Sequence, residues 1–299
     1  MSEDSSAPVC YRHPQKETYV QCVRCERYIC PDCMNQASVG WQCPECVKAG
    51  QKTIRQARTA LGGVGGHNGL VTKTLIGINV AVFLAGLVLV GTNALGDIFQ
   101  GGLFGGQTPL HIYGALTPGP IQWQSGGESV ITGGVMGGEY YRFLTSMFLH
   151  YGIVHLLFNM YVLWVVGRHL ERDLGPVRYL ALYLLSGLGG NVLTYLVEAP
   201  NTASAGASGC IFGLFGAMVL INRKLGRDNS GIYVVVGLNL VLTFTIPGIS
   251  WTGHLGGLIT GAALGAALAH APRQNRTLIQ TGAFAAALVV FVLLILWRT

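Results

Sequence analysis

Charge is what this 299-residue sequence has least of. Charged residues make up 11% of the chain, whereas hydrophobic residues make up 51% and the mean hydropathy is +0.46. A soluble globular domain usually carries about 25% charged residues, so the composition excludes an ordinary water-exposed surface and indicates a polytopic membrane protein. The formal net charge is +6, but many basic residues lie in short segments between apolar runs. That pattern belongs to membrane topology, and we expect no nucleic-acid partner.

Seven apolar runs are long enough to cross a bilayer, since a span needs roughly 20 residues. They cover residues 72–91, 150–167, 176–197, 206–222, 231–247, 252–270 and 277–297. The sequence therefore predicts an all-α polytopic fold over residues 70–299. Residues 92–149 form a long loop, and a loop of this length usually has a function or partial structure of its own.

The chain begins with a different kind of sequence. The first 50 residues are polar and contain seven of the eight cysteines, so we expect no cleavable signal peptide there. Residues 51–69 are basic and then glycine-rich, which is typical of a flexible linker. We therefore predict a small domain over residues 1–50, a linker over 51–69 and a membrane domain over 70–299.

Basic residues are unevenly distributed between alternate loops. Those after the second, fourth and sixth runs contain Arg168, Arg172, Arg223, Lys224, Arg227, Arg273 and Arg276. The intervening loops contain little or no charge. Because cytoplasmic loops collect Lys and Arg, we expect a cytoplasmic N-terminal domain, with the 92–149 loop and the C-terminus outside. The compact loops and the lack of an organelle presequence favour a bacterial plasma membrane.

Cysteine and histidine form closely spaced pairs near the start of the chain. Each pair is separated by two residues: Cys10 and His13, Cys22 and Cys25, Cys30 and Cys33, and Cys43 and Cys46. Structural zinc sites use four cysteines, or three cysteines and one histidine. Eight ligands therefore predict two structural zinc ions. A reducing cytosol keeps thiols free, which favours zinc over the alternatives of disulfides or a coincidental cluster.

This segment resembles a B-box-type zinc finger. In that family the pairs interleave, which implies one ion held by Cys10, His13, Cys30 and Cys33 and another held by Cys22, Cys25, Cys43 and Cys46. A module this small cannot build a large core, so metal would supply much of its folding energy. We expect it to be a docking or regulatory module for a cytoplasmic protein partner.

Few polar residues fall within the apolar runs, and each invites a functional interpretation because it is costly in lipid. The second run contains His155 and Asn159, one helical turn apart; the fourth contains Ser208 and the sixth contains His254. These three runs cross the membrane in the same direction, and each residue lies near the start of its run. All four side chains are therefore predicted in the outer half of the bilayer.

Glycines indicate how Ser208 and His254 could meet. The sixth run repeats glycine every fourth residue, at Gly253, Gly257, Gly261 and Gly265, and the fourth run contains Gly209 and Gly213. Two glycine faces allow helix backbones to approach closely, which would bring the two side chains within hydrogen-bond reach. A serine needs an adjacent base to become a nucleophile, and a neutral histidine suits that role. Taken alone, Ser208 could instead be a helix-packing residue.

A third, acidic member is missing from this group. None of the 13 carboxylates falls in the outer half of an apolar run: Glu171 lies near the cytoplasmic edge and Glu198 in a loop. The sequence therefore predicts a Ser–His dyad rather than a triad, with no cofactor for catalysis. His155, Asn159 and the backbone N–H groups at the start of the fourth run are suitable donors to an oxyanion. The lack of deep carboxylates also argues against an ion-coupled transporter.

Together these pieces closely resemble the rhomboid intramembrane serine proteases across about residues 70–270. The matching motifs are Tyr141-Arg142, HLLFN from His155 to Asn159, GASG from Gly206 to Gly209, and GHLGGLITG from Gly253 to Gly261. The seventh run resembles the six-plus-one form of the family.

The resemblance implies roles for individual residues. Ser208 would be the nucleophile and His254 the general base, and the oxyanion hole would consist of His155, Asn159 and the Ser208 amide. Tyr141 and Arg142 would help to fold the 92–149 loop. Family members often have a tyrosine four residues after the serine, where this chain has Phe212. We expect its ring to stack on the histidine, without the hydrogen bond of a tyrosine.

We therefore expect a serine endopeptidase that hydrolyses peptide bonds in or near the transmembrane segments of single-span proteins within the lipid bilayer. The rival interpretation is a catalytically silent rhomboid-like adaptor that binds transmembrane helices. Inactive relatives typically lack the serine or the histidine, and both are present here.

Overall fold

The computed structural model describes residues 7–53, 58–65, 69–90, 107–125, 128–246 and 248–299. The chain divides into two compact units, Met1–Gln56 and Ala57–Thr299, called here the N-terminal unit and the membrane unit. The prediction of a mostly helical polytopic membrane protein with a small N-terminal domain is confirmed.

The N-terminal unit is a small fold built around its cysteines. It contains η1 (Pro31–Cys33), the antiparallel pair β1 (Asn35–Gln36) and β2 (Trp41–Gln42), and α1 (Pro44–Thr53). Its buried core, among the described residues, consists of Ile29 and five cysteines. One aliphatic side chain cannot hold a domain by hydrophobic burial, so this unit depends on what its cysteines bind.

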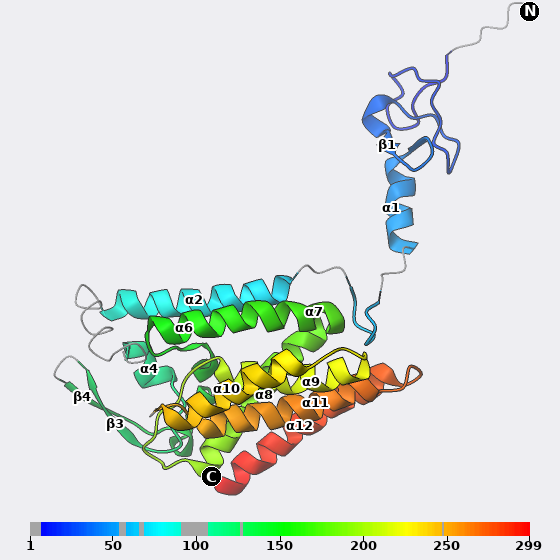
Figure 1. Cartoon of the computed structure of the whole chain (residues 1–299). Helices are drawn as coiled ribbons and strands as arrows, with labels where there is room; N and C mark the ends of the chain where they lie inside the picture. Colours follow the sequence, from blue (N-terminus) through cyan, green and yellow to red (C-terminus); the bar gives the residue numbers. More distant parts are fainter. Residues whose placement is uncertain (1–6, 54–57, 66–68, 91–106, 126–127, 247) are drawn as a thin grey trace, which may run out of the picture. The chain divides into compact units, whose positions relative to one another are not determined.

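The membrane unit is a bundle of long apolar helices, drawn from cyan to red in Figure 1. In chain order they are α2 (Leu70–Val90), α6 (Gly152–Val162), α7 (Arg168–Leu174), α8 (Pro176–Val197), α9 (Ser208–Lys224), α10 (Ser230–Thr245), α11 (Trp251–His270) and α12 (Arg276–Arg298). Among the described residues, five helical stretches are long and apolar enough to cross a membrane: Leu70–Val90, Gly152–Leu174, Pro176–Val197, Trp251–His270 and Arg276–Arg298. The fourth and fifth predicted runs form shorter helices: α9 has 17 residues and α10 has 16.

The second helix extends further than predicted. A π-helical stretch, η5 (Leu163–Gly167), joins α6 to α7, so the helix continues to Leu174 instead of ending at residue 167. Arg168, predicted to lie in a loop, is therefore helical, and its guanidinium lies 4.4 Å from the centre of the Trp164 ring. This cation–π contact and the snorkelling of a long basic side chain explain why charge is tolerated there.

Glycines form the contact between α9 and α11, which lie side by side at the centre of the bundle (Figure 1). A methyl group at Gly257 would overlap the carbonyl oxygen of Gly209, and one at Gly261 would overlap that of Gly213. On the α8 side, a methyl group at Gly190 would lie 2.5 Å from the carbonyl oxygen of Gly253. The backbone of α11 is therefore held between two neighbours at van der Waals distance.

The connection between α2 and α6 has structure of its own, although its residues 91–106 lie outside the described part. It contains α4 (Pro109–Gly114), the hairpin of β3 (Ile121–Ser125) and β4 (Glu128–Thr132), η3 (Val135–Gly137), α5 (Arg142–Thr145) and η4 (Ser146–Phe148). Arg142 is fully buried within it. Its guanidinium donates to the carbonyl oxygens of Ala115 (2.7 Å) and Ile112 (3.0 Å) and to Glu139 (2.6 Å).

Part of the predicted linker is folded. Residues 58–65 form a tight turn in which the amide of Gly62 donates to Thr59 O and the amide of Thr59 donates to Gly63 O. Leu61 is buried in the core of the membrane unit, and Arg276 donates to Ala60 O. The glycines that indicated flexibility instead permit this turn, since Gly62 has a φ of +88°.

The seventh helix, α12, is attached by polar contacts at both ends. Gln280 is buried, accepts from Arg178 (2.6 Å) and donates to Leu268 O (3.0 Å). At the other end Arg298 donates to the carbonyl oxygen of Glu198 (3.2 Å). Most of the outward surface of α12 is apolar and exposed, as expected for a helix that faces lipid.

Candidate active site

Ser208 is the first residue of α9 and follows a turn that only glycine adopts easily. Gly206 has a φ of +145°, and a Cβ there would lie 2.9 Å from Cε1 of His155. The absence of a side chain at Gly206 therefore lets the turn pass directly beneath the α6 histidine. Gly209, next to the serine, would place a Cβ 3.2 Å from Gly253 O, so it keeps α9 close to α11.

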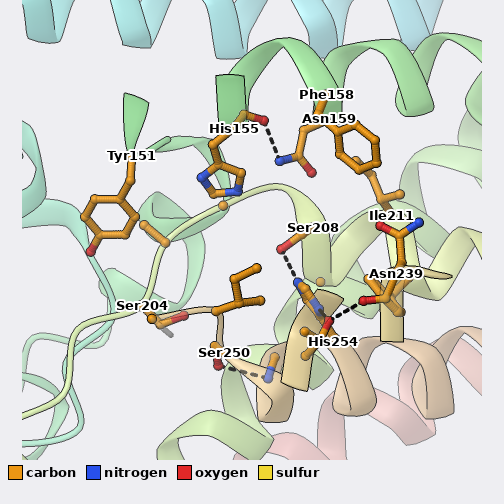
Figure 2. Close-up of a pocket in the computed structure, with 18 of the residues that line it drawn as sticks. Tyr151, His155, Phe158, Asn159, Ser204, Ser208, Ile211, Asn239, Ser250 and His254 are labelled. Carbon is orange, nitrogen blue, oxygen red and sulfur yellow. Dashed lines mark hydrogen bonds between the residues drawn. The ribbon is translucent and has the colours of Figure 1, made fainter. Parts of the chain in front are cut away.

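His254 lies in the first turn of α11. Ser250 caps this helix by accepting from the amide of Gly253 at 3.2 Å, which fixes where the first turn begins. The His254 ring is buried, with 9% of the residue exposed. Its Nε2 lies 2.8 Å from Oγ of Ser208, a hydrogen bond drawn as a dashed line in Figure 2.

The second ring nitrogen of His254 contacts the neighbouring helix. Nδ1 lies 2.7 Å from Oγ1 of Thr243 on α10, and that hydroxyl also donates to Asn239 O at 2.7 Å. Sequence reasoning missed this residue, because it searched only for an acidic partner. The available signal was weak: Thr243 and Asn239 are polar residues one turn apart in the apolar run 231–247.

An aromatic ring supports His254 from one face. The Phe212 ring stacks on the imidazole with ring centres 4.2 Å apart and planes inclined by 14°. Phe212 in turn meets Phe215 edge-on at 6.0 Å. The predicted stacking is therefore present, and the packing leaves the imidazole little freedom to rotate.

His155 and Asn159 lie on the α6 side of the same space, above Ser208 in Figure 2. The Asn159 amide donates to His155 O at 2.8 Å, which leaves its second N–H available for another acceptor. Asn159 is buried and His155 is half-buried. The four polar residues predicted to converge from three helices are therefore brought together.

These side chains line a cavity of about 420 Å³. Most of its wall is apolar or aromatic, including Tyr151 and Phe158 near α6 and Ile211 on α9, whereas α10 contributes Asn239 and Thr243. A concave apolar pocket with a few convergent polar groups is the usual form of a site for a substrate. A peptide segment in this pocket would meet Ser208, His254 and the α6 donors together.

Two further histidines near the pocket, His150 and His111, are buried and form no hydrogen bond with Ser208. His150 is 1% exposed and meets His155 edge-on at 5.0 Å, while His111 of α4 stacks on Tyr151 at 4.5 Å. Burial lowers the pKa of His111 to about 4, so this ring is neutral at physiological pH. Tyr141 is half-exposed and its ring centre lies 5.7 Å from the Arg142 guanidinium.

The N-terminal unit contains two groups of four ligand atoms, each group within 4.8 Å. One consists of Cys10, His13, Cys30 and Cys33, and the other of Cys22, Cys25, Cys43 and Cys46. These are the sets implied by the resemblance to interleaved fingers. Burial raises the pKa of the Cys10 and Cys22 thiols, but backbone N–H donors outweigh it and leave both at about 6. In the same groups burial raises the pKa of the Cys33 thiol to about 11 and that of the Cys46 thiol to about 12. Thiolate is the form that binds metal, and the two groups could each hold an ion.

Taken together, the fold and the pocket define a polytopic helical membrane protein with a Ser–His pair inside its helix bundle. Residues 137–271 match the Rhomboid domain family. Among curated proteins, the chain is 42% identical over 163 residues to Rhomboid protease GluP of Bacillus subtilis, which covers 53% of this chain and 30% of that protein. It is 37% identical over 167 residues to RHOMBOID-like protein 4 of Arabidopsis thaliana, covering 54% and 42%.

A shorter relative is matched over most of its length. The chain is 39% identical over 136 residues to Putative rhomboid protease YdcA of Bacillus subtilis, covering 44% of this chain and 68% of that protein. The chain therefore belongs to the rhomboid family. It spans less than half the length of the first two relatives, 30% and 42%, and the family match over residues 137–271 lies in the membrane unit.

Proposed function

We propose that this protein is an intramembrane serine endopeptidase that cleaves single-span membrane proteins in or near their transmembrane segments. The observation that carries the proposal is the 2.8 Å hydrogen bond between Oγ of Ser208 and Nε2 of His254, inside an apolar pocket within the helix bundle. Membership of the rhomboid family and relatives named as rhomboid proteases support the same reaction class.

Each polar residue of the site has a distinct part in the proposed hydrolysis. His254 Nε2 takes the proton of Ser208 as Oγ attacks the carbonyl carbon of the scissile bond. The negative charge that develops on the carbonyl oxygen is stabilised by the Ser208 amide, His155 and the free N–H of Asn159. The imidazolium then gives its proton to the leaving amine, and a water molecule repeats the sequence to release the acyl group.

The substrate must be partly unwound in this pocket. A helical backbone keeps its carbonyl oxygens in hydrogen bonds, so a scissile carbonyl becomes accessible only where the substrate helix opens. The resemblance to the rhomboid proteases implies targets of this kind: segments weakened by glycine or similar residues, with a small residue before the scissile bond.

The N-terminal unit is proposed to hold two structural zinc ions. Seven of the eight ligands are cysteines and the eighth is His13, and sets of Cys₄ and Cys₃His are those that structural zinc prefers. The ions would supply folding energy to this unit and take no part in peptide hydrolysis. By the distribution of basic residues, this unit lies on the cytoplasmic side and Ser208 in the opposite half of the bilayer. The expectation of a bacterial plasma membrane stays a prediction.

The test uses purified full-length protein in lipid vesicles with a single-span model substrate. Wild-type protein should cleave it, and Ser208→Ala and His254→Ala should each abolish cleavage. A fluorophosphonate probe should label the wild type but neither variant. Cleavage that persists in Ser208→Ala would refute the serine mechanism. Substrate binding without labelling or cleavage in the wild type would instead support the adaptor.

A further inference from the structure

The imidazole of His254 has two nitrogens, and only one can carry the proton if the ring is to act as a base. Nε2 must be unprotonated where it faces the Ser208 hydroxyl, so Nδ1 must carry the hydrogen. In a Ser–His–Asp triad, a carboxylate on Nδ1 enforces this tautomer. Among the described residues no carboxylate contacts His254, and Thr243 is the hydrogen-bond partner of Nδ1.

The direction of the Thr243 hydrogen bond follows from counting protons. A threonine hydroxyl has one hydrogen to donate and two lone pairs to accept with. The Thr243 hydrogen points to Asn239 O, 2.7 Å away in the preceding turn of α10. Its oxygen can then only accept from His254, 2.7 Å away, so Nδ1 is the protonated nitrogen. This tautomer is assigned from the hydrogen-bond network.

We propose that Thr243 is the positioning residue that holds His254 in its base-competent tautomer, in place of the missing carboxylate. The inference rests on the proposed function of Ser208 and His254. Thr243 is 4% exposed, so water does not readily replace its hydroxyl. Together with the Phe212 ring on one face, this bond fixes both the orientation and the protonation of the imidazole.

The bond also gains strength when it is needed. As Nε2 takes the Ser208 proton, the ring becomes an imidazolium, and its Nδ1–H becomes a charged donor to the same oxygen. An interaction that is stronger in the transition state than in the ground state raises kcat rather than lowering KM. Because the acceptor is a neutral hydroxyl, the gain is smaller than a carboxylate would give.

The test compares three variants of full-length protein in vesicles. Thr243→Val keeps the shape but removes the hydroxyl, and Thr243→Ser restores a hydroxyl at the same place. Thr245→Val is the matched control, because Thr245 makes the same bond to the preceding turn, to Val241 O at 2.9 Å, but is exposed and does not line the pocket. The readouts are kcat and KM for the model substrate and the rate of fluorophosphonate labelling.

We expect Thr243→Val to lower kcat and the labelling rate by about tenfold, equivalent to ~1.4 kcal/mol of transition-state stabilisation. KM should change little, Thr243→Ser should recover most of the rate, and Thr245→Val should behave as wild type. In ¹⁵N spectra of histidine-labelled protein, His254 should carry its proton on Nδ1 in the wild type. In Thr243→Val it should shift toward the Nε2-protonated form.

The outcomes separate this inference from the function on which it depends. Cleavage by Ser208→Ala overturns the proposed function itself. If Ser208→Ala is inactive but Thr243→Val retains wild-type kcat and an Nδ1-protonated His254, the role of Thr243 is refuted and the dyad stands. A loss of rate in Thr243→Val that Thr243→Ser does not restore, with the tautomer unchanged, also refutes it.

Discussion

The first turn of α11, which carries His254, packs between α8 and α9, and a single methyl group should disturb its position measurably. In Gly190→Ala, the new Cβ would lie 2.5 Å from the carbonyl oxygen of Gly253, where ordinary van der Waals contact begins at 3.4 Å. The two helices must therefore separate by about 0.9 Å at the residue before the histidine. A displacement of about 1 Å in a catalytic group can lower the rate by about a hundredfold.

A matched variant separates geometry from general destabilisation. In Gly265→Ala the new Cβ would lie 2.5 Å from Cα of Ala217, which is the same overlap with a backbone atom but near the far end of α11. Overpacking of this kind costs about 1–3 kcal/mol, so both variants should unfold at lower temperature in detergent. Gly282→Ala on α12, where nothing lies within 4 Å, is the neutral control.

The assay is cleavage of a single-span substrate in vesicles, normalised to folded protein. We expect Gly190→Ala to lose tenfold to a hundredfold in kcat, whereas Gly265→Ala keeps a rate close to wild type per folded molecule. Equal losses in the two variants would mean that bundle stability, not the position of His254, controls the rate. A fully active and fully stable Gly190→Ala would show that α8 and α11 are not held as tightly as described.

Two further predictions concern other parts of the chain. A strong chelator should release two zinc ions per chain and unfold the N-terminal unit, which limited proteolysis would detect. Cys22→Ser should retain only the ion held by the group that contains Cys10. An unchanged metal content in Cys22→Ser would contradict this grouping of the ligands. Arg142→Ala should destabilise the membrane unit by about 3–5 kcal/mol, because it removes the cation from Glu139 and leaves the buried carbonyl oxygens of Ala115 and Ile112 without this donor. Arg142→Lys should lose less, since it keeps the charge without the planar fork. Equal thermal unfolding temperatures for wild type and Arg142→Ala would contradict this.

The helices were predictable because lipid makes simple demands on sequence. A span must be long, apolar and helical, so each of the seven apolar runs coincides with a helix of the structure, although α9 and α10 are shorter than the other five. The third run coincides with α8 at both ends. The end of the second was misjudged because Arg168 and Arg172 signalled a loop. In the structure these side chains extend from a helix that continues through a π-helical stretch to Leu174. Charge near the end of a span does not distinguish a loop from a snorkelling helix.

Segments outside the apolar runs were less predictable. The elements between α2 and α6 are short, and their fold depends on contacts distant in sequence, such as those of Arg142 with Ala115 and Ile112. Glycines in residues 61–63 were interpreted as flexibility, but they form a turn against the bundle. Composition shows that a backbone can bend; it does not show what the bend packs against.

For the site, the glycine rows and the shared direction of three helices were enough to predict that Ser208 and His254 lie within hydrogen-bond distance. Thr243 was not found, because threonine is common in apolar helices and usually bonds only to its own backbone. Its contact with His254 depends on the rotation of α10 about its axis, which the weak apolar periodicity of that run does not specify. The catalytic roles of all these residues stay predictions until the variants are measured.

The glycine contact between α9 and α11 also limits how this pocket can be altered. No larger residue fits at Gly257 or Gly261, so the contact between α9 and α11, the helices that carry Ser208 and His254, cannot be altered by substitution at these positions. Freedom exists on the facing walls, where the exposed Phe158 of α6 and the half-buried Asn239 of α10 line the cavity. Engineering of cleavage preference should therefore begin with libraries at these two positions and leave the glycine rows untouched.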